Sequence, residues 1–322
     1  MKLITVKDTY FLAVITLMKL VRWSSSARLK ELVLKYLAFA AYGWKRDKRQ
    51  LIESNLAKVF GRTLSERERR EIVKGVFYEF WRDVFSLLPT RTERASLKRI
   101  ELRGVEHLHR ALKVGKGLIV WESRFFGRRA LAKQILHENG FSIHQVHAEN
   151  HIGGFDHDGA SASWVRYYII KRFFDKGQKP FVAEVIYLPS SDSLAFTRII
   201  LSRLKHNATV CIAGDGRRGQ KRIPVKFLGR TELFSTGMVS LAKISGASVL
   251  PMFCIQERDG QIRLIIERPI QIETGMERER GLENSLTQYV SVLEAYIRRY
   301  PEQYRNWHSL GQSMGAEPSI VA

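Results

Sequence analysis

The side chains best suited to chemistry gather where a predicted buried strand meets a predicted helix, in GLIVWESRFFGRRALAKQIL at 117–136. Active-site groups often lie at such strand-to-helix turns. Glu122 ends the strand, and it is either a base with a tuned pKa or a structural partner of nearby cations. Arg124, Arg128 and Arg129 follow. Their guanidinium groups suit a phosphate or a developing oxyanion, so the turn favours anion binding.

Histidines that could act as a base follow another predicted strand, in FSIHQVHAENHIGGFDHD at 141–158. We expect this strand to lie beside 117–121, and neighbouring parallel strands end at the same rim. His147 or His151 would then face Arg124 as a general base, with His157 a further imidazole. The alternative is a loop of ordinary polar histidines. Their spacing fits no zinc ligand set, so we predict no metal and no cofactor.

A glycine-rich basic loop, AGDGRRGQKRIPVKFLGR at 213–230, favours a phosphate or anionic head group. Its candidate acidic residue is Asp215, and its candidate substrate contacts are Arg217, Arg218 and Lys221. Thr236 opens the next predicted helix, where it could bind an anion or simply cap the helix. The alternative for the loop is a solvated basic turn.

The charge balance points to a polyanionic partner. The 322 residues hold 53 Lys and Arg against 32 Asp and Glu, a net charge of +21. The basic residues alternate with apolar and aromatic ones, as in LMKLVRW at 17–23, which is typical of a membrane–water interface. We therefore expect an anionic membrane surface and no nucleic acid. A nucleic-acid-binding protein stays as an alternative that rests on charge alone.

Four segments are predicted to position these groups. Residues 1–26 read as an interfacial membrane anchor helix, because the apolar run at 10–18 is too short to span a bilayer. Residues 27–100 read as helical, with a capping box at Ser65–Glu68. Residues 101–310 alternate strands with helices, which predicts an α/β domain with a mostly parallel sheet flanked by helices. Residues 311–322 read as a flexible tail.

The expected strands are 117–121, 141–147, 179–187, 208–215, 248–255 and 261–267, and the helices between them are 128–138, 161–174, 193–205 and 237–246.

The chain resembles the lipid A biosynthesis (lauroyl/myristoyl) acyltransferases of the lysophospholipid acyltransferase superfamily. The resemblance rests on the order of RQLIESNLAKVFGRTLSERERREIV, GVEHLHRALKVGKGLIV, AGDGRRGQKRIPVKFLGR, STGMVSLAKISGASVLPMF and RRYPEQYRNWH. It implies an α/β fold held by an N-terminal helical region at the cytoplasmic face of a bacterial inner membrane. It also implies transfer of a fatty acyl group from an acyl carrier protein or coenzyme A thioester to a lipid or glycolipid hydroxyl.

The resemblance also implies a catalytic pair at the turn, a His followed four residues later by an acid. A gap-free alignment from GKG puts Arg124 and Arg129 at those places. Guanidinium stays protonated and cannot act as a base. Asp215 matches an acidic residue of the family, and Arg217 stands where a second Asp is common. Two mechanisms stay open: acyl transfer with a base taken from Glu122, His147 or His151, or a family member that has lost the chemistry and binds anionic lipid or thioester.

Overall fold

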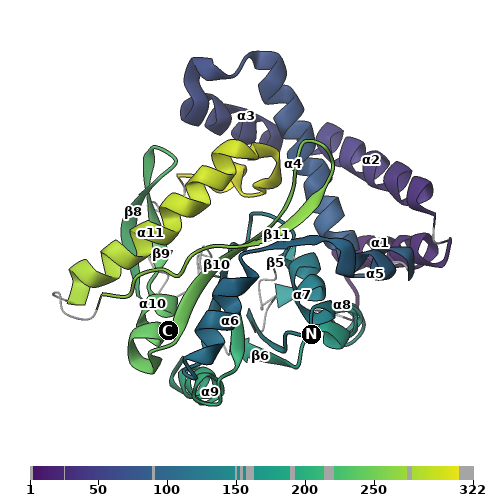
Figure 1. Ribbon diagram of the computed structural model, residues 1–322. Coiled ribbons are helices and arrows are strands. Elements are labelled where there is room, and N and C mark those ends of the chain that lie inside the picture. Colours follow the sequence, from purple (N-terminus) through teal and green to yellow (C-terminus); the bar gives the residue numbers. More distant parts are fainter. Residues whose placement is uncertain are drawn as a thin grey trace.

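The fold is built on one seven-stranded sheet, shown by the computed structural model in Figure 1. The structure describes residues 3–24, 26–88, 91–148, 151–152, 155–156, 163–188, 193–213, 221–273 and 278–311. The strand order is β1-β11-β10-β2-β7-β3-β6. The five strands from β10 to β6 run parallel, while β11 is antiparallel to β10. The prediction of a mostly parallel sheet flanked by helices is confirmed. The strand bounds are β1 Glu101–Arg103, β2 Leu118–Glu122, β3 Ile143–Ala148, β6 Glu184–Leu188, β7 Thr209–Ala213, β10 Ser248–Gln256 and β11 Ile262–Ile266.

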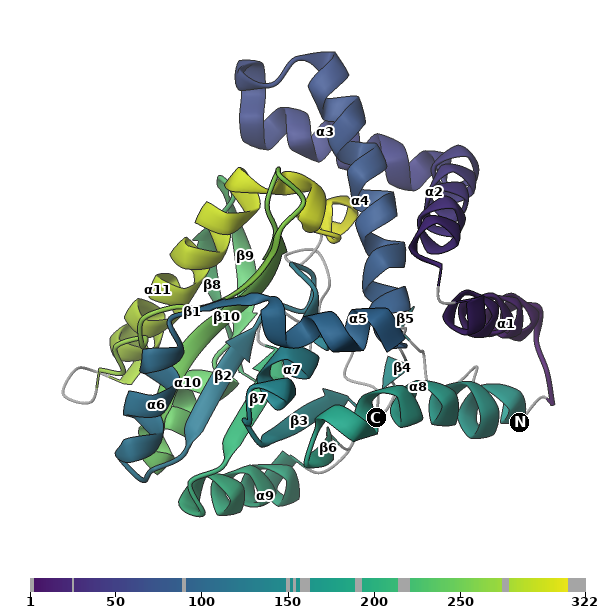
Figure 2. The ribbon, with the colours of Figure 1, turned by 45° about the vertical axis from the view of Figure 1, so that its right-hand side comes forward.

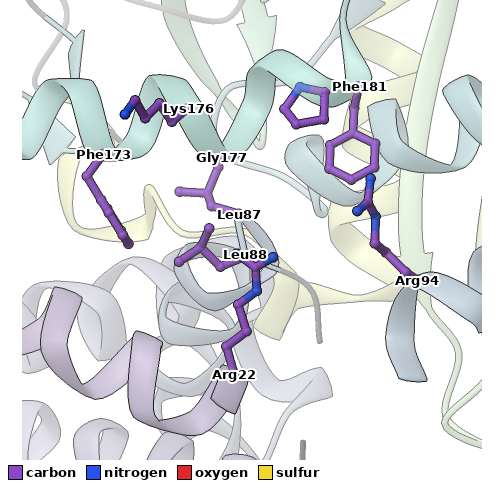
Figure 3. Close-up of a pocket in the computed structure, with 9 residues that line it drawn as sticks. Arg22, Leu87, Leu88, Arg94, Phe173, Lys176, Gly177 and Phe181 are labelled. Carbon is purple, nitrogen blue, oxygen red and sulfur yellow. The ribbon is translucent and has the colours of Figure 1, made fainter. Parts of the chain in front are cut away.

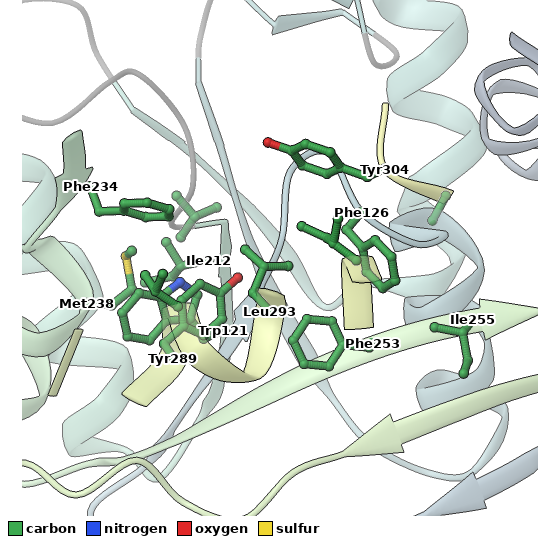
Figure 4. Packing of buried hydrophobic residues seen from close by; sticks show 14 of the residues in the cluster. Trp121, Phe126, Ile212, Phe234, Met238, Phe253, Ile255, Tyr289, Leu293 and Tyr304 are labelled. Atoms are coloured by element: carbon green, nitrogen blue, oxygen red, sulfur yellow. The ribbon is translucent and has the colours of Figure 1, made fainter. Parts of the chain in front are cut away.

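Helices cover both faces of this sheet. One face packs against α6 and α7, where Val120 and Cys211 meet Ile135. The other face packs against α9, α10 and α11, where Trp121 stacks on Tyr289 with ring centroids 3.9 Å apart (Figure 4). Successive residues of a strand point to opposite faces, so a strand covered on both sides is apolar throughout. The bounds are α6 Val105–Lys113, α7 Arg129–Glu138, α9 Ser193–Lys205, α10 Gly237–Ser245 and α11 Arg278–Arg299.

The helical N-terminal part stands against one end of the sheet domain (Figure 2). The predicted capping box opens α4, because the Ser65 hydroxyl accepts from the Glu68 N–H and the Glu68 carboxylate accepts from the Ser65 N–H. The helix then buries Val73, Val76 and Trp81. The bounds are α1 Val6–Ser24, α2 Ala27–Trp44, α3 Arg46–Phe60, α4 Glu66–Ser86 and α5 Arg91–Ser96, and further along the chain η4 Arg166–Ile170, α8 Lys171–Gln178 and η5 Lys179–Phe181.

The apolar stripe of α2 does not all face the protein. Leu34 and Ala38 are buried, whereas Leu32, Tyr36 and Phe39 are 65%, 71% and 77% exposed. The helix therefore presents apolar side chains on two sides, only one of which the protein covers. Among the described residues, no helix is both long and apolar enough to cross a membrane.

Two details of the sheet differ from the expectation. The strand β3 does not pair with β2, because β7 lies between them. In addition, the second half of the basic loop forms an antiparallel hairpin of β8, Arg222–Phe227, and β9, Arg230–Ser235. Its two-residue turn places Leu228 and Gly229 at φ of 51° and 76°. Such a turn is usually signalled by Asn-Gly or Asp-Gly, so the sequence carried no clear sign of it.

A short antiparallel pair of β4, His151–Ile152, and β5, Phe155–Asp156, follows β3. The predicted tail at 311–322 lies outside the described residues except for Gly311.

Candidate active site

The turn between β2 and α7 is shaped by its own small residues. The buried Ser123 hydroxyl accepts hydrogen bonds from the N–H groups of Phe125 and Phe126, at 3.2 and 3.0 Å. Gly127 has a φ of 68°, and a Cβ there would lie 2.7 Å from the Cys254 carbonyl oxygen. Only glycine fits that conformation and that contact without strain. The turn is therefore fixed against β10.

A segment near the C-terminus clamps the same turn from outside. Tyr304 forms an isolated antiparallel bridge with Phe126. The Arg305 N–H donates to the Phe125 carbonyl at 2.8 Å, and the Arg305 guanidinium donates to the Gly127 and Arg124 carbonyls at 2.6 and 3.1 Å. This contact explains RRYPEQYRNWH in structural terms: the motif holds the turn that carries the candidate site.

Glu122 is held as a buried carboxylate by two cations from α7. Its side chain is 1% exposed, and it accepts hydrogen bonds from Lys133 Nζ at 2.9 and 3.0 Å and from Arg129 Nε at 2.5 Å. Burial alone would raise the pKa of this carboxyl, but the charges and hydrogen bonds of Lys133 and Arg129 outweigh burial and lower the pKa to about 2. These contacts suit a structural partner rather than a base that works near neutral pH.

Arg128 points away from the turn, toward α4. It is 4% exposed, lies 3.4 Å from the Glu79 carboxylate and donates to the Gln256 side chain at 2.7 Å. Arg124, by contrast, is half-buried, and its guanidinium lies 5.3 Å from the Phe125 ring centroid. Of the three arginines, Arg128 and Arg129 bind internal carboxylates, and their contact with a substrate stays a prediction. Contact of Arg124 with a ligand likewise stays a prediction.

His147 reaches the same rim from β3. The register pairs Glu122 with Ala213 and Gln145 with Cys211, so the end of β7 lies between Glu122 and His147. Burial lowers the pKa of His147 from 6.5 to about 3, and the positive charges of Arg129 and Lys133 add to this effect. The half-buried imidazole is therefore neutral at physiological pH. Both strand ends lie at the same rim, but the expected pairing of the two strands is wrong because β7 separates them, and the approach of His147 to Arg124 stays a prediction.

The other candidates divide between described and undescribed parts of the chain. Asp215, Arg217 and Arg218 lie outside the described residues, and so does the His151 side chain. Lys221 is exposed, and its carbonyl accepts from the Thr236 N–H at 3.1 Å and from the Thr236 hydroxyl at 3.2 Å. Thr236 is 3% exposed. It thus joins the two ends of segment 221–236, and anion binding by Thr236 stays a prediction.

Sequence reasoning missed Lys133 and Arg305. Lys133 follows Arg129 by four residues, so both side chains face the same side of α7. Two cations at this spacing, shortly after an acid at a strand end, could have indicated that both pair with that acid. Arg305 offered no such signal, because its partners, backbone carbonyl groups and the Asp83 carboxylate, lie far away in the sequence. Within the described residues, no three His, Cys, Asp or Glu side chains come together to hold a metal ion.

Comparison with known proteins gives consistent matches. The sequence model of a family described as bacterial lipid A biosynthesis acyltransferase matches residues 2–151 and 166–310. A phosphatidylinositol mannoside acyltransferase of Mycolicibacterium smegmatis is 21% identical over 276 residues, which is 85% of this chain and 82% of that protein. A protein of the same name from Mycobacterium tuberculosis is 22% identical over 233 residues, covering 72% of this chain and 65% of that protein.

Proposed function

Since this chain belongs to the bacterial lipid A biosynthesis acyltransferase family, whose members and relatives indicate an acyltransferase acting on lipids, we propose how it does so. The protein transfers a fatty acyl group from an acyl carrier protein or coenzyme A thioester to a hydroxyl of a lipid or glycolipid. The names of the two mycobacterial relatives support a glycolipid acceptor. No cofactor is needed for this reaction.

The observation that carries this proposal is the position of His147 at the rim where β2 and β3 end, near enough to Arg129 and Lys133 for their charges to help lower its pKa. A general base must be unprotonated, and His147 meets this condition at physiological pH. In the proposed step the imidazole takes the proton of the acceptor hydroxyl while its oxygen attacks the thioester carbonyl. The C–S bond then breaks, and the imidazolium returns the proton to the departing thiolate.

Arg124 supplies the positive charge in this scheme. Its half-buried guanidinium lies at the turn beside the strand end, on the Phe125 ring. A guanidinium there suits the oxyanion of the tetrahedral intermediate or a phosphate of the donor. Arg129 has a positioning role, because its hydrogen bond to Glu122 holds the start of α7 in place.

A second function, binding without chemistry, is favoured by one feature. Arg124 and Arg129 stand at the aligned places of the family's catalytic pair, and Glu122 is locked between Arg129 and Lys133. The same cations also weaken His147 as a base. A family member of this kind would bind anionic lipid or acyl thioester as a regulator or scaffold.

A thiol-release assay separates the two functions. Purified protein is mixed with palmitoyl-coenzyme A, or with palmitoylated acyl carrier protein, and a bacterial total lipid extract. Release of thiol that depends on the extract, together with an acylated lipid, supports transfer, and His147→Gln should lower its rate at least tenfold. Binding of the thioester with no extract-dependent release in any donor arm favours the scaffold.

We also propose that the protein docks peripherally on the cytoplasmic face of a bacterial inner membrane. The support is the exposed stripe of α2, defined as Leu29, Leu32, Tyr36 and Phe39, which recurs at helical spacing. A helix with an apolar stripe that the protein does not cover is suited to an apolar environment on that side. Exposed cations at both ends of α2, Arg28, Lys45 and Arg46, suit anionic head groups.

A further inference from the structure

A cavity of about 230 Å³ lies between the N-terminal helices and α8, apart from the candidate active site. Its walls come from the end of α1, the residues after α4, the helix α5, and α8 with η5 (Figure 3). None of its lining residues belongs to the candidate active site, although His147 hydrogen-bonds Gln178, the residue after the lining Gly177. The lining residues are Arg22, Leu87, Leu88, Arg94, Phe173, Lys176, Gly177, Pro180 and Phe181.

The inner part of this cavity is apolar, and the elements that form it are tightly packed. Leu87 and Phe181 are 6% and 3% exposed. A Cβ on Gly177 would lie 2.8 Å from the Leu87 carbonyl oxygen, so α8 rests directly on the end of α4. Leu88 and Phe173 are half-buried and complete the apolar wall. Such a surface suits hydrocarbon rather than a fully hydrated ion.

The mouth of the cavity is positively charged. Arg22, Arg94 and Lys176 are exposed at its edge, and none of the lining residues that the structure describes is acidic. The Arg94 guanidinium lies 4.9 Å from the Phe181 ring centroid. Asp175, the nearest acid on α8, interacts with Tyr187 of β6. The cavity therefore combines a cationic mouth with an apolar interior, which is complementary to an anionic amphiphile.

The position of α1 places this mouth beside the proposed membrane surface. A buried ion pair of Asp8 and Arg166, 2.7 Å long, fastens the first turn of α1 to η4. At the other end of α1, Arg22 reaches the cavity, and the next residue, Trp23, is 85% exposed. Figure 2 shows α1 alongside α8 at the same end of the molecule as α2.

We propose that this cavity binds the head group of one anionic phospholipid. The phosphate lies between Arg22 and Arg94, with Lys176 adding positive charge at the edge although its side chain points away from the two arginines (Figure 3), and the glycerol with the first chain carbons lies on Leu88 and Phe173. This inference rests on the proposed membrane docking, but it names a separate site that takes no part in acyl transfer. A lipid is a better occupant than a soluble anion because the interior is apolar and the mouth adjoins exposed Trp23.

The test uses a soluble lipid, so that it does not depend on membrane docking. Dihexanoyl phosphatidylglycerol, kept below its micelle concentration, is titrated into the full-length protein by isothermal calorimetry. The triple variant Arg22→Gln, Arg94→Gln, Lys176→Gln should raise the dissociation constant at least tenfold. Leu88→Trp, which fills the cavity and leaves the charge unchanged, should do the same.

Three exposed cations on α6 and α9 provide the matched control. The variant Arg110→Gln, Lys113→Gln, Lys205→Gln removes equal charge and should bind within twofold of the original protein. Equal lipid binding by the cavity triple variant would overturn the proposal. So would inorganic phosphate binding as tightly as the lipid, or dihexanoyl phosphatidylcholine binding equally well.

The stripe variant Tyr36→Ser, Phe39→Ser separates this proposal from membrane docking. It should lose binding to vesicles and keep its affinity for the short-chain lipid. A stripe variant that still binds vesicles contradicts docking through α2, whereas the calorimetric result alone decides the cavity.

Discussion

Glu122 ends β2 as a buried carboxylate that two cations of α7 contact. The sequence placed an acid at a strand end beside three arginines and left both roles open. The structure adds Lys133, which faces Glu122 together with Arg129 from the first two turns of α7. With two cations at hydrogen-bond distance, the carboxylate joins α7 to β2, and both of its oxygens already accept hydrogen bonds from Lys133 or Arg129, which leaves it poorly placed to take a proton from a substrate.

Removing this carboxylate should destabilise the protein strongly. Glu122→Gln leaves the buried Lys133 ammonium without a counter-charge, so the free energy of unfolding in urea should fall by about 3–5 kcal/mol. The control is Glu66→Gln, whose side chain is 71% exposed and whose loss should cost less than about 0.5 kcal/mol. A variant with unchanged stability but no activity would instead make Glu122 the base.

The lowered pKa of His147 predicts an unusual pH dependence of the reaction. With a pKa of about 3, the imidazole stays unprotonated as the pH falls through 6.5. The value of kcat/KM should therefore stay nearly constant between about pH 8 and pH 5, whereas an ordinary histidine base would lose activity about tenfold per unit below its pKa. A decrease in kcat/KM as the pH falls through 6.5, the ordinary pKa of histidine, would show that another imidazole is the base.

The same residue affects stability, with a sign that follows from its pKa. Between pH 6.5 and 3 the unfolded chain binds a proton at His147 that the folded chain does not bind, so stability falls as the pH falls through this window. His147→Gln removes this contribution. The difference in unfolding free energy between the two proteins should change by up to about 1.4 kcal/mol per pH unit there. A parallel pH dependence of the two proteins would contradict the lowered pKa.

At the level of the elements, Arg305 couples the C-terminal segment to the turn. The Arg305→Lys variant keeps the positive charge. Its ammonium lacks the planar fork with which the Arg305 guanidinium donates to the Gly127 and Arg124 carbonyls together. We expect kcat to fall about tenfold while the protein still folds, because the turn carrying Arg124 loses its clamp. Arg298→Lys is the control, since Arg298 is 41% exposed and pairs only with Glu294 among the described residues. Equal kcat for both variants would mean that the clamp is dispensable.

The elements also show which sequence signals are reliable. Runs such as LIVWE and TVCIA predicted buried parallel strands correctly, because a strand covered on both faces is apolar throughout. The order of strands in the sheet is not a local property, so β7 between β2 and β3 could not be read from the chain. The β8–β9 hairpin was missed because Leu228 occupies a turn position that seldom holds leucine.

The candidate site was predictable only in part, for the same reason. The turn at Glu122 and the rim histidine follow from strand ends and were found. The pairing of Arg128 with Glu79 and the clamp of Arg305 depend on helices and segments distant in the sequence, and no local pattern signals them. Half of the basic loop, with Asp215, Arg217 and Arg218, lies outside the described residues, so those roles stay predictions.

The molecule as a whole is basic and carries its uncovered apolar stripe on α2, which predicts binding to anionic vesicles. Tyr36→Ser with Phe39→Ser should lower the partition coefficient onto phosphatidylglycerol vesicles at least tenfold, measured by sedimentation. The control replaces two exposed apolar residues elsewhere, Val114→Ser and Ile244→Ser, and should bind normally. Salt-dependent binding to plain DNA that exceeds vesicle binding would favour the nucleic-acid alternative.

The central claim is that the fold still transfers an acyl group although Arg124 and Arg129 occupy the places of the usual pair. Whole-lipid mass spectrometry tests it most directly, in cells lacking the gene and in cells that express either the original protein or His147→Gln. We expect a lipid heavier by one fatty acyl group that rises with the original protein and stays low with the variant. A lipid profile that is the same in all three strains would contradict transfer and make the protein a binding member of its family.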